Sequence, residues 1–452
     1  MNNPYVKPRR KALSRMSADN FRAGFDAVKD ESAMSYKEAS KYKNFRVENG
    51  ALTDGWGVEE SPCLGGAAKV ASAWEYVAEK DGRRETTPMY CDTDGWIHTV
   101  KEGADEKLAA VRFAAPPIAV NYRLYGSDVV LMCSGKDKMA VYDGEGIRTI
   151  DPSPQITSMA LHYERLFVTT ANEPDSVRFS DDLDPTNWAE GLDSGGFVTL
   201  ADGYGKSNKV VAFLNYVYVF RDYGISRMIA YADQTEFSVS NLYVSSGRIY
   251  AGSVTVCGDR IIFLASDGLY VFDGLSTTKI LPRLGDLTKY KESAVGAYFD
   301  GKYYLAYGSG GEKNDSLLVY DVAQKTAELS DGLEISSFFV SDGLKAVCEN
   351  RAAGITPCGA VFGTPTSKVW KVPYNALSRS DRIKKINEIC LETATDMKLK
   401  VLFDGRAKTY SIKGKSGVQR VKVGLRGRKL GILLSANATN TRIAEVVALV
   451  SG

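Results

Sequence analysis

Short apolar runs alternate with turn residues through most of the chain. Val254–Gly274 shows the unit: Arg260–Ala265 and Leu269–Phe272 are rich in β-branched and aromatic residues, which favour half-buried strands. Ser266-Asp267-Gly268 separates the two runs, and Asp and Gly are the residues that a tight hairpin turn requires. The pattern predicts a strand, a tight turn, a second strand and another turn.

This unit returns at a regular interval. The most apolar strand of each copy begins at Met89, Val130, Leu166, Val217, Ile261, Tyr303 and Ala346. A β-rich repeat of about 40–50 residues is typical of propeller blades, and a single blade cannot bury both of its faces, so several must stack around an axis. The sequence predicts about seven blades, at residues 68–100, 118–150, 155–200, 208–247, 250–282, 292–330 and 333–373.

The N-terminal region follows another pattern. Residues 1–25 have little periodicity and are expected to form an extended arm that orders against a partner. Ser35-Tyr36-Lys37-Glu38 has the spacing of a capping box, which predicts a short helix over residues 30–43. Residues 45–52 and 56–59 are expected to form a hairpin, and this segment is a candidate for completing the last blade and closing the ring.

Beyond Pro373 the chain changes to longer alternating strands separated by glycines. They are expected at residues 386–391, 398–403, 409–412, 419–423, 429–434 and 443–450. Strands at this spacing without a helix predict a small β-sandwich. The expected fold is therefore all-β, with a basic N-terminal arm and short helix at 1–45, a propeller at 46–374 and a C-terminal sandwich at 375–452.

Composition narrows the class of protein. The chain has 452 residues, of which 44% are hydrophobic, as in ordinary globular proteins. No apolar run approaches 18 residues, and no apolar segment follows the basic start, so neither membrane insertion nor a secretory signal is expected. The seven cysteines include no CxxC pair, which indicates free thiols in a reducing cytoplasm. Neither of the two histidines has a ligand-spaced partner, so we expect no metal site and no cofactor.

Charge is distributed unevenly although the net charge is only +2. Residues 1–15 contain five basic and no acidic residues, residues 375–452 contain 16 basic and 6 acidic ones, and the remainder contains 36 basic and 49 acidic ones. Such asymmetry predicts that the ends meet nucleic acid or an acidic surface, which could belong to a neighbouring copy; a solvated basic face is the alternative. The candidate contact residues are Lys7, Arg9, Arg10, Lys11, Arg15, Arg420, Lys422, Arg426, Arg428 and Lys429. Arg420 and Lys422 are expected to share one face of a strand, because alternate residues do.

Motifs that suggest catalysis or ligand binding are weak. Gly203–Ser207 resembles the end of a phosphate-binding loop, but the required first glycine is replaced by Leu200, and an inter-blade turn explains the segment. The carboxylates of Asp181–Asp184 are a candidate calcium site or simply a turn. There is no GxSxG element, and His98 and His162 are expected to be packed or surface side chains. Carboxylate pairs assembled from different blades stay open, but no catalytic residue is indicated and the chain is not expected to be an enzyme.

Several short stretches together are similar to a known group of proteins. Phe21-Arg22-Ala23-Gly24-Phe25 is followed by Tyr42-Lys43-Asn44-Phe45 and Glu48–Thr53, Phe179-Ser180-Asp181 leads into Asp184–Trp188, and Leu425–Leu430 precedes the last strand. These stretches resemble the β-propeller tail proteins of tailed bacteriophages, which include packaged-DNA stabilisation or tail hub proteins and nozzle or head–tail connector proteins. One departure is Asp54-Gly55-Trp56-Gly57, which stands where many such proteins carry an Arg-Gly pair.

The resemblance implies a structural virion protein, assembled in the host cytoplasm and located in the tail or at the head–tail junction. Copies of the chain, six being the expected number, would form a ring below the portal, extend the DNA channel and help to retain packaged DNA. The implied partners are other copies, a portal or adaptor protein, other tail proteins and the DNA in the channel. Two alternatives stay open: a carbohydrate- or receptor-binding module of a phage tail, and a propeller hydrolase.

Overall fold

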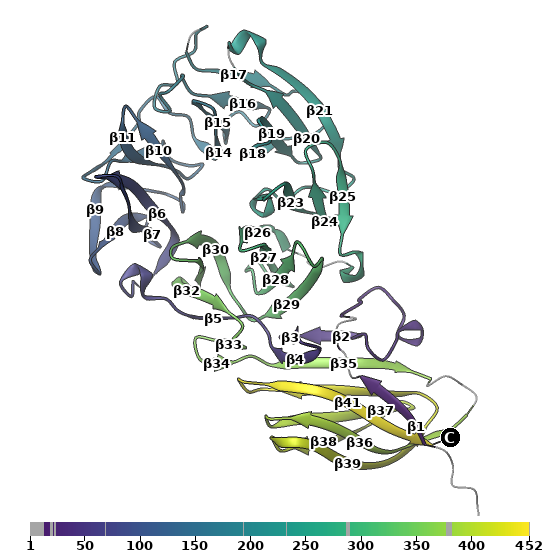
Figure 1. Cartoon of the computed structure of the whole chain (residues 1–452). Helices are drawn as coiled ribbons and strands as arrows, with labels where there is room; N and C mark the ends of the chain where they lie inside the picture. The colour runs from purple at the N-terminus through teal and green to yellow at the C-terminus, as the bar shows by residue number, and fades with distance from the viewer. Residues whose placement is uncertain are drawn as a thin grey trace, which may run out of the picture.

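The computed structural model describes residues 13–18, 21, 24–67, 69–192, 194–231, 233–285, 290–376 and 382–451. Two β-structures make up this part of the chain, a seven-bladed propeller and a β-sandwich beside its rim (Figure 1). The propeller follows the predicted repeat, and each of its first six blades is a contiguous four-stranded antiparallel sheet. The predicted fold class is therefore confirmed.

Blades one to three are each formed by four consecutive strands of the chain. Blade one contains β6 (Val70–Lys80), β7 (Arg83–Asp92), β8 (Trp96–Lys101) and β9 (Ala104–Arg112). Blade two contains β10 (Ile118–Leu124), β11 (Ser127–Cys133), β12 (Ala140–Tyr142) and β13 (Ile147–Thr149). Blade three contains β14 (Ile156–His162), β15 (Arg165–Thr170), β16 (Ser176–Phe179) and β17 (Gly196–Thr199).

Blades four to six continue the ring. Blade four contains β18 (Ser207–Phe213), β19 (Tyr216–Arg221), β20 (Gly224–Ile229) and β21 (Ser238–Val244). Blade five contains β22 (Thr255–Cys257), β23 (Arg260–Ala265), β24 (Gly268–Phe272) and β25 (Thr277–Ile280). Blade six contains β26 (Tyr290–Phe299), β27 (Lys302–Gly308), β28 (Ser316–Asp321) and β29 (Thr326–Asp331).

Apolar side chains of neighbouring blades pack against each other. Between blades four and five, Phe220 meets Phe263 edge-on with ring centroids 5.4 Å apart, and Tyr218 meets Phe272 at 5.2 Å. The first strands of adjacent blades lie next to one another around the axis (Figure 1). Each blade thus buries on its neighbours the faces that it cannot cover alone.

Blade seven closes the ring with a strand from the N-terminal region. It contains β30 (Ile335–Val340), β31 (Leu344–Cys348) and β32 (Arg351–Thr356), followed by β5 (Gly57–Glu60) and the short strands β33 (Ala360–Val361) and β34 (Thr364–Pro365). β5 pairs antiparallel with β32, with the buried Val58 opposite Ile355. The expectation that an N-terminal segment completes the last blade is confirmed for these residues. The expected hairpin of residues 45–52 with 56–59 is not formed, because residues 45–48 pair with 51–54 and residues 57–60 pair with β32.

The sandwich combines both ends of the chain. One sheet has the order β3 (Phe45–Glu48), β4 (Ala51–Asp54), β41 (Arg442–Ser451), β36 (Lys384–Thr393), β39 (Lys415–Gly427), with β1 (Leu13–Ala18) also paired to β41. The other has the order β2 (Lys41–Lys43), β35 (Lys368–Asn375), β40 (Leu430–Ala436), β37 (Met397–Phe403), β38 (Arg406–Ile412). All six strands expected after Pro373 are present.

The division of the chain differs from the expected ranges 1–45, 46–374 and 375–452. Residues 13–18, 41–54 and 368–375 belong to the sheets of the sandwich rather than to an arm or the propeller. The packing of Trp370 gives the physical reason, because this fully buried side chain meets Phe21 and Tyr42 edge-on, with centroids 5.2 and 5.6 Å away. The N-terminal aromatic side chains complete a core that the C-terminal strands alone leave open.

The α-helix expected over residues 30–43 is not formed. Glu31–Ala33 is a three-residue 3-10 helix, and the capping-box residues make only a turn, in which the Glu38 carboxylate accepts a hydrogen bond from the Ser35 N–H at 2.6 Å. Lys371 and the Tyr374 N–H both bind the Glu31 carboxylate, so contacts with β35 override the helical pattern. The other 3-10 helices described are Pro62–Leu64, Gln234–Glu236, Ala251–Ser253 and Pro282–Leu284. Among the described residues there is no helix with the length and apolarity needed to cross a bilayer.

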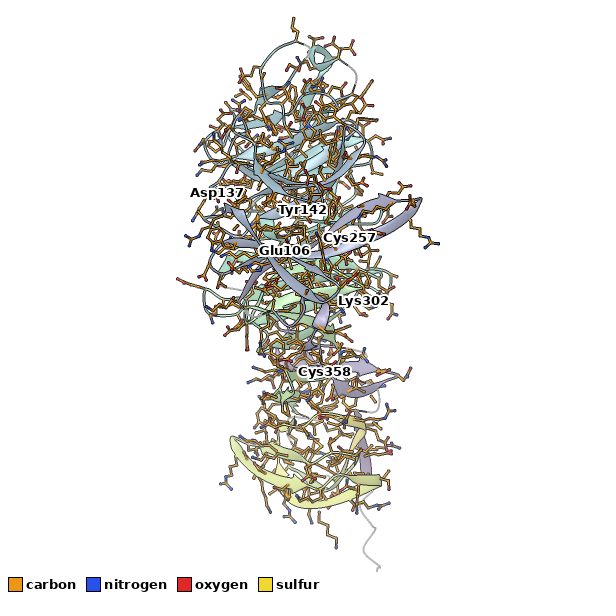
Figure 2. All side chains as sticks on the ribbon, turned by 90° about the vertical axis from the view of Figure 1, so that its left-hand side faces the viewer. Glu106, Asp137, Tyr142, Cys257, Lys302 and Cys358 are labelled. Carbon is orange, nitrogen blue, oxygen red and sulfur yellow. The ribbon has the colours of Figure 1, made fainter. Side chains whose placement is uncertain are left out.

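A buried polar cluster joins the two structures. Lys368 is fully buried, with its Nζ 3.2 Å from the Asp54 carboxylate, which also accepts the N–H groups of Asn440 and Thr441. The Gly359 carbonyl accepts from the same Nζ, and a Cβ at Gly359 would lie 2.9 Å from it. This cluster lies near Cys358, which Figure 2 shows between the propeller and the sandwich. Asp54 and Lys368 both belong to the sandwich, and the Gly359 carbonyl, in the loop between β32 and β33, connects this cluster to blade seven.

Candidate interaction surfaces

The structure brings basic residues from both ends of the chain onto one sheet of the sandwich. Arg15 of β1 lies 3.5 Å from Glu445 of β41, and Arg420 of β39 lies 3.3 Å from Glu388 of β36. The side chains that alternate with these on β36 and β41, such as Ile389, are buried in the core. Arg15 and Arg420 therefore lie on the outer face of the sheet.

Three basic side chains of β39 form what we call the basic row: Arg420, Lys422 and Arg426. All three are exposed, and Arg420 and Lys422 share one face of the strand, as strand alternation predicts. Two exposed apolar side chains flank the row: Val418 lies at its start, and Ile383 immediately precedes β36, whose Lys385 pairs with Arg426. At about 3.4 Å per strand residue, positions 418 to 426 extend over roughly 27 Å.

Arg428 and Lys429 lie at the turn between β39 and β40. Their N–H groups donate to the Asp404 carboxylate at 2.9–3.0 Å, and these backbone hydrogen bonds from Lys429 and Arg428 lower the pKa of Asp404. Both basic side chains are exposed. The turn is thus held by its backbone, and its side chains stay available beside the basic row.

The predicted arm is placed only in part. Lys7, Arg9, Arg10 and Lys11 lie outside the described residues. Residues 13–18, which include Arg15, were expected to order only against a partner; instead they form β1 and pair with β41 of the same chain. The expectation for this stretch is corrected because the edge of β41 offers hydrogen-bond partners within the chain.

A second surface lies on the propeller and was missed in the sequence. In blades one to six a two-residue turn joins the first and second strands, and its first residue has φ between 46 and 66°. These residues are Asp81, Tyr125, Tyr163, Leu214, Gly258 and Asp300. Asp and Gly suit this backbone conformation, but a bulky side chain there costs roughly 1–2 kcal/mol. Aligning the turns of the repeat would have revealed Tyr, Tyr and Leu in three consecutive blades.

These three bulky side chains are also exposed: Tyr125 by 78%, Tyr163 by 59% and Leu214 by 55%. In a four-stranded antiparallel blade the turns after the first and third strands lie at the same end. We call that end of the propeller the hairpin face. Leu183, in the loop after the third strand of blade three, is also exposed there.

Acidic side chains lie beside the exposed apolar ones of blades two and three. Tyr125 Oη donates to Asp184 at 2.6 Å, and the Leu183 N–H donates to the Glu164 carbonyl, so the turns of blades two and three touch. Glu164 and Asp182 are exposed, and in the described part of the chain neither carboxylate has a hydrogen bond or ion pair. We call Tyr125, Tyr163, Leu183, Leu214, Glu164 and Asp182 the turn patch.

The motif that resembles a phosphate-binding loop has a structural role. Gly203–Ser207 connects blades three and four, and the Gly205 carbonyl accepts hydrogen bonds from the fully buried Arg221. The Lys206 N–H donates to Asp222 at 3.0 Å. Because no helix follows this segment, its N–H groups do not form a phosphate cradle.

Histidines and carboxylates of the candidate sites are engaged by neighbouring groups. His98 lies between Asp92 and Asp105, at 3.3 and 3.1 Å, and stacks on Tyr90. Burial lowers the pKa of His162. Asp181 accepts from the Asn187 amide at 2.7 Å. No group of three or more His, Cys, Asp or Glu side chains that could hold a metal ion occurs among the described residues.

All seven cysteines are free thiols, and four of them are buried. Burial raises the pKa of Cys257 to about 12, and it does the same for Cys91 and Cys348. Because the thiolate is the reactive form, this raised pKa disfavours reaction of the three thiols at neutral pH.

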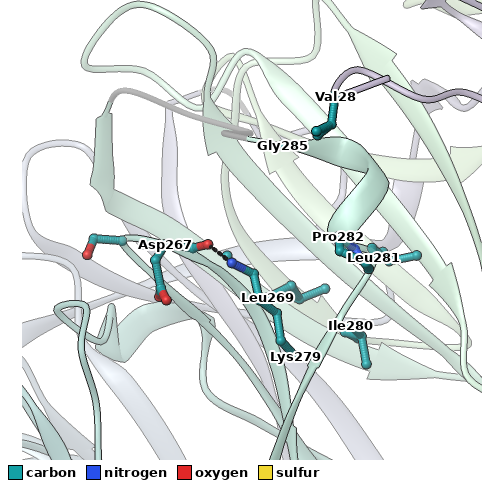
Figure 3. A pocket seen from close by; sticks show the side chains of 10 residues that line it. Val28, Asp267, Leu269, Lys279, Ile280, Leu281, Pro282 and Gly285 are labelled. Atoms are coloured by element: carbon teal, nitrogen blue, oxygen red, sulfur yellow. Dashed lines mark hydrogen bonds between the residues drawn. The ribbon is translucent and has the colours of Figure 1, made fainter. Parts of the chain in front are cut away.

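A cavity of about 330 Å³ lies at blade five (Figure 3). Its lining is Val28, Ser266, Asp267, Gly268, Leu269, Lys279, Ile280, Leu281, Pro282 and Gly285. The polar groups of the lining are already engaged: the Lys279 ammonium donates to the Asp267 carbonyl, and the Asp267 carboxylate accepts from Tyr270 and Ser246. No set of free polar groups converges on the cavity, so its geometry supports no particular ligand.

Comparisons with known proteins bear on the fold alone. No protein-family model and no curated protein matches the chain. Among solved structures, BBS1N in complex with ARL6DN, soaked with mercury, is similar at 13% identity and a TM-score of 0.40, over 66% of this chain and 95% of that one. Raptor from Chaetomium thermophilum is similar at 7% identity and a TM-score of 0.44, over 70% of this chain and 29% of that one.

Proposed function

We propose that this protein is a structural component of a tailed-bacteriophage virion. Several copies, six being the expected number, form a ring in the tail or head–tail connector that extends the portal DNA channel and helps to retain packaged DNA. Its partners are other copies, the portal or adaptor protein, other tail proteins and the DNA in the channel. The motif resemblance of Phe21–Phe25, Asp184–Trp188 and Leu425–Leu430 points to this class.

One observation carries the proposal: β1 and β39 place basic residues from both chain ends on one exposed sandwich face, whereas the central part of the sequence is acidic. A closed ring of identical chains needs a heterologous contact, in which one patch meets a different patch on the next copy. A basic sandwich face and an acidic propeller are such a pair. They lie on different parts of one rigid chain, as a repeating contact requires.

The test is the mass of the purified full chain in solution, alone and mixed with portal complex from particles. We expect a closed oligomer or capture by the portal. Reversing Arg426, Arg428 and Lys429 to Glu should weaken assembly at least about tenfold, because three opposite charges are replaced by like charges. The matched control reverses Lys398, Arg406 and Lys408, exposed basic residues of the other sheet, and should assemble like the wild type. A chain that stays monomeric and ignores the portal would overturn the proposal.

A carbohydrate- or receptor-binding module of a phage tail is the second candidate. The exposed Tyr125 and Tyr163 favour it, because aromatic side chains at a propeller face can stack on sugar rings. Binding of the isolated protein on a glycan array, lost on substitution of both tyrosines, would support this function in place of the ring.

A further inference from the structure

We infer that the turn patch on the hairpin face is the surface that receives the basic row of the next copy in the assembly. The inference rests on the proposed ring and names its second contact surface. The occupant is a second copy of this chain, and the contact joins the propeller of one copy to the sandwich of its neighbour.

The first argument is the unusual turn chemistry. At the same turn position, blades one and six have Asp, blade five has Gly, and blades two, three and four have Tyr125, Tyr163 and Leu214. Bulky residues in left-handed backbone are destabilising, and such outliers collect where a surface has a function. Three of them in consecutive blades, all exposed, indicate a surface kept for contact rather than for the stability of the single chain.

The second argument is that the two surfaces match in chemistry. The turn patch has exposed apolar side chains beside Glu164 and Asp182, and neither of these carboxylates is neutralised in the described part of the chain. The basic row has three cationic side chains between the exposed Val418 and Ile383. In such an interface the apolar side chains bury contact area, and the opposite charges fix how the two surfaces align.

The third argument is position. Blades two to four lie on the side of the ring away from the sandwich (Figure 1). The sandwich is attached at the opposite rim, where Lys43 and Asn44 contact Asp331 at the end of blade six. The turn patch of one chain therefore cannot meet the basic row of the same chain. Two complementary surfaces at opposite ends of a rigid molecule produce a head-to-tail contact, which closes into a ring when the rotation allows.

The main test replaces Tyr125, Tyr163 and Leu214 together by Asn in the full chain. Asn tolerates the left-handed conformation, and Tyr125→Asn places Asn directly before Gly126, which is a preferred turn pair. Relief of three strained turns should stabilise the chain, and loss of the Tyr125–Asp184 hydrogen bond should offset part of this gain. We therefore expect the thermal midpoint to stay equal or to rise by a few degrees, while self-association measured by sedimentation weakens at least tenfold. The control replaces Asp81 and Asp300, at the same turn position, by Asn and should change neither quantity.

A charge exchange tests the pairing of the two surfaces. Glu164→Lys with Asp182→Lys should weaken assembly at least tenfold, and so should Lys422→Glu with Arg426→Glu. All four substitutions in one chain should restore it, because each contact then regains opposite charges. Two exchanged surfaces that fail to rescue each other would overturn the pairing.

The outcomes separate this inference from the proposed function. If the wild type forms a ring and the triple Asn variant forms the same ring, the turn patch is not the contact and the ring proposal stands. If the wild type neither self-associates nor binds the portal complex, the proposed function and this inference both fail. Glycan binding that depends on Tyr125 and Tyr163 would overturn the inference in favour of a receptor-binding face.

Discussion

The propeller and the sandwich are both β-structures, but they are assembled from the chain in opposite ways. Each of the first six blades is a contiguous segment whose strands pair with their neighbours in sequence. The sandwich pairs residues from the two chain ends, and the Ser14 hydroxyl donates to the Val450 carbonyl across 436 positions. The same strand pattern therefore pairs with neighbouring strands in the propeller. In the sandwich it pairs with strands from the other end of the chain.

The largest expected loss of stability comes from removing a buried aromatic side chain, and it tests whether the sandwich core and the propeller core unfold separately. Trp370→Ala should destabilise the sandwich by about 4 kcal/mol, because a fully buried ring with two edge-on aromatic partners leaves a large cavity. Hydrogen exchange should rise in the sandwich strands β1–β4 and β35–β41 and stay low in blades one to five. Phe263→Ala is the matched change in the propeller and should raise exchange in blades four and five. Equal exchange throughout the chain in both variants would show that the two regions unfold as one unit.

The next effect concerns the junction between the regions. Asp54→Ala should cost about 3 kcal/mol, because it leaves the buried Lys368 ammonium and two N–H groups without their acceptor. Chemical denaturation measures the loss, and Asp54→Asn should lose less because one acceptor oxygen remains. Asp396→Ala removes an exposed ion pair with Lys413 and is the control, with little change expected. An Asp54→Ala chain as stable as this control would contradict the role of the cluster.

The smallest effect depends on pH. Burial raises the pKa of Glu328, whose carboxylate accepts from Trp56 Nε1 at 2.7 Å. The folded chain thus holds this proton more tightly than the unfolded chain, so the group's contribution to stability falls as pH rises through the raised pKa. Glu328→Gln should therefore gain stability relative to the wild type between pH 4 and 7, by about 1 kcal/mol or less. The exposed Glu312→Gln is the control, and a pH-independent difference for Glu328→Gln would contradict the expectation.

The blades could be predicted because their information is local. Asp267-Gly268 and its counterparts mark turns within a few residues of the strands that they join, so the repeat, the number of blades and the six C-terminal strands are found as predicted. The bounds are less exact: blade one continues beyond the expected residue 100 to Arg112, and residues 368–373 of the expected seventh blade belong to β35 of the sandwich. The partners of β1, β2 and β35 could not be predicted in this way. No local signal shows that Phe21 and Tyr42 pack on Trp370, or that Ser35–Glu38 forms a turn instead of a helix.

The candidate surfaces divide similarly. Strand alternation predicted that Arg420 and Lys422 share a face, and the structure confirms that both are exposed. That Arg15 lies on the same sheet depends on a pairing between the chain ends, which alternation does not reveal. Tyr125, Tyr163 and Leu214 were missed because each residue looks ordinary within its own blade. They become unusual only when the same turn position is compared across the six blades. Contact with a neighbouring copy stays a prediction.

The pairing of β1 with β41 also decides how the molecule carries mechanical load. Leu13 lies opposite Ser451, so the two ends of the described chain leave the sandwich at the same point. Tension between the termini would separate β1 from β41 one hydrogen bond at a time, which needs little force compared with sliding whole strands past each other. The pairing of β5 with β32, which closes the propeller ring, comes later along the chain than β1. It would bear no load until the sandwich had opened. Under tension the sandwich therefore opens first, and the propeller is protected from the load until it has opened.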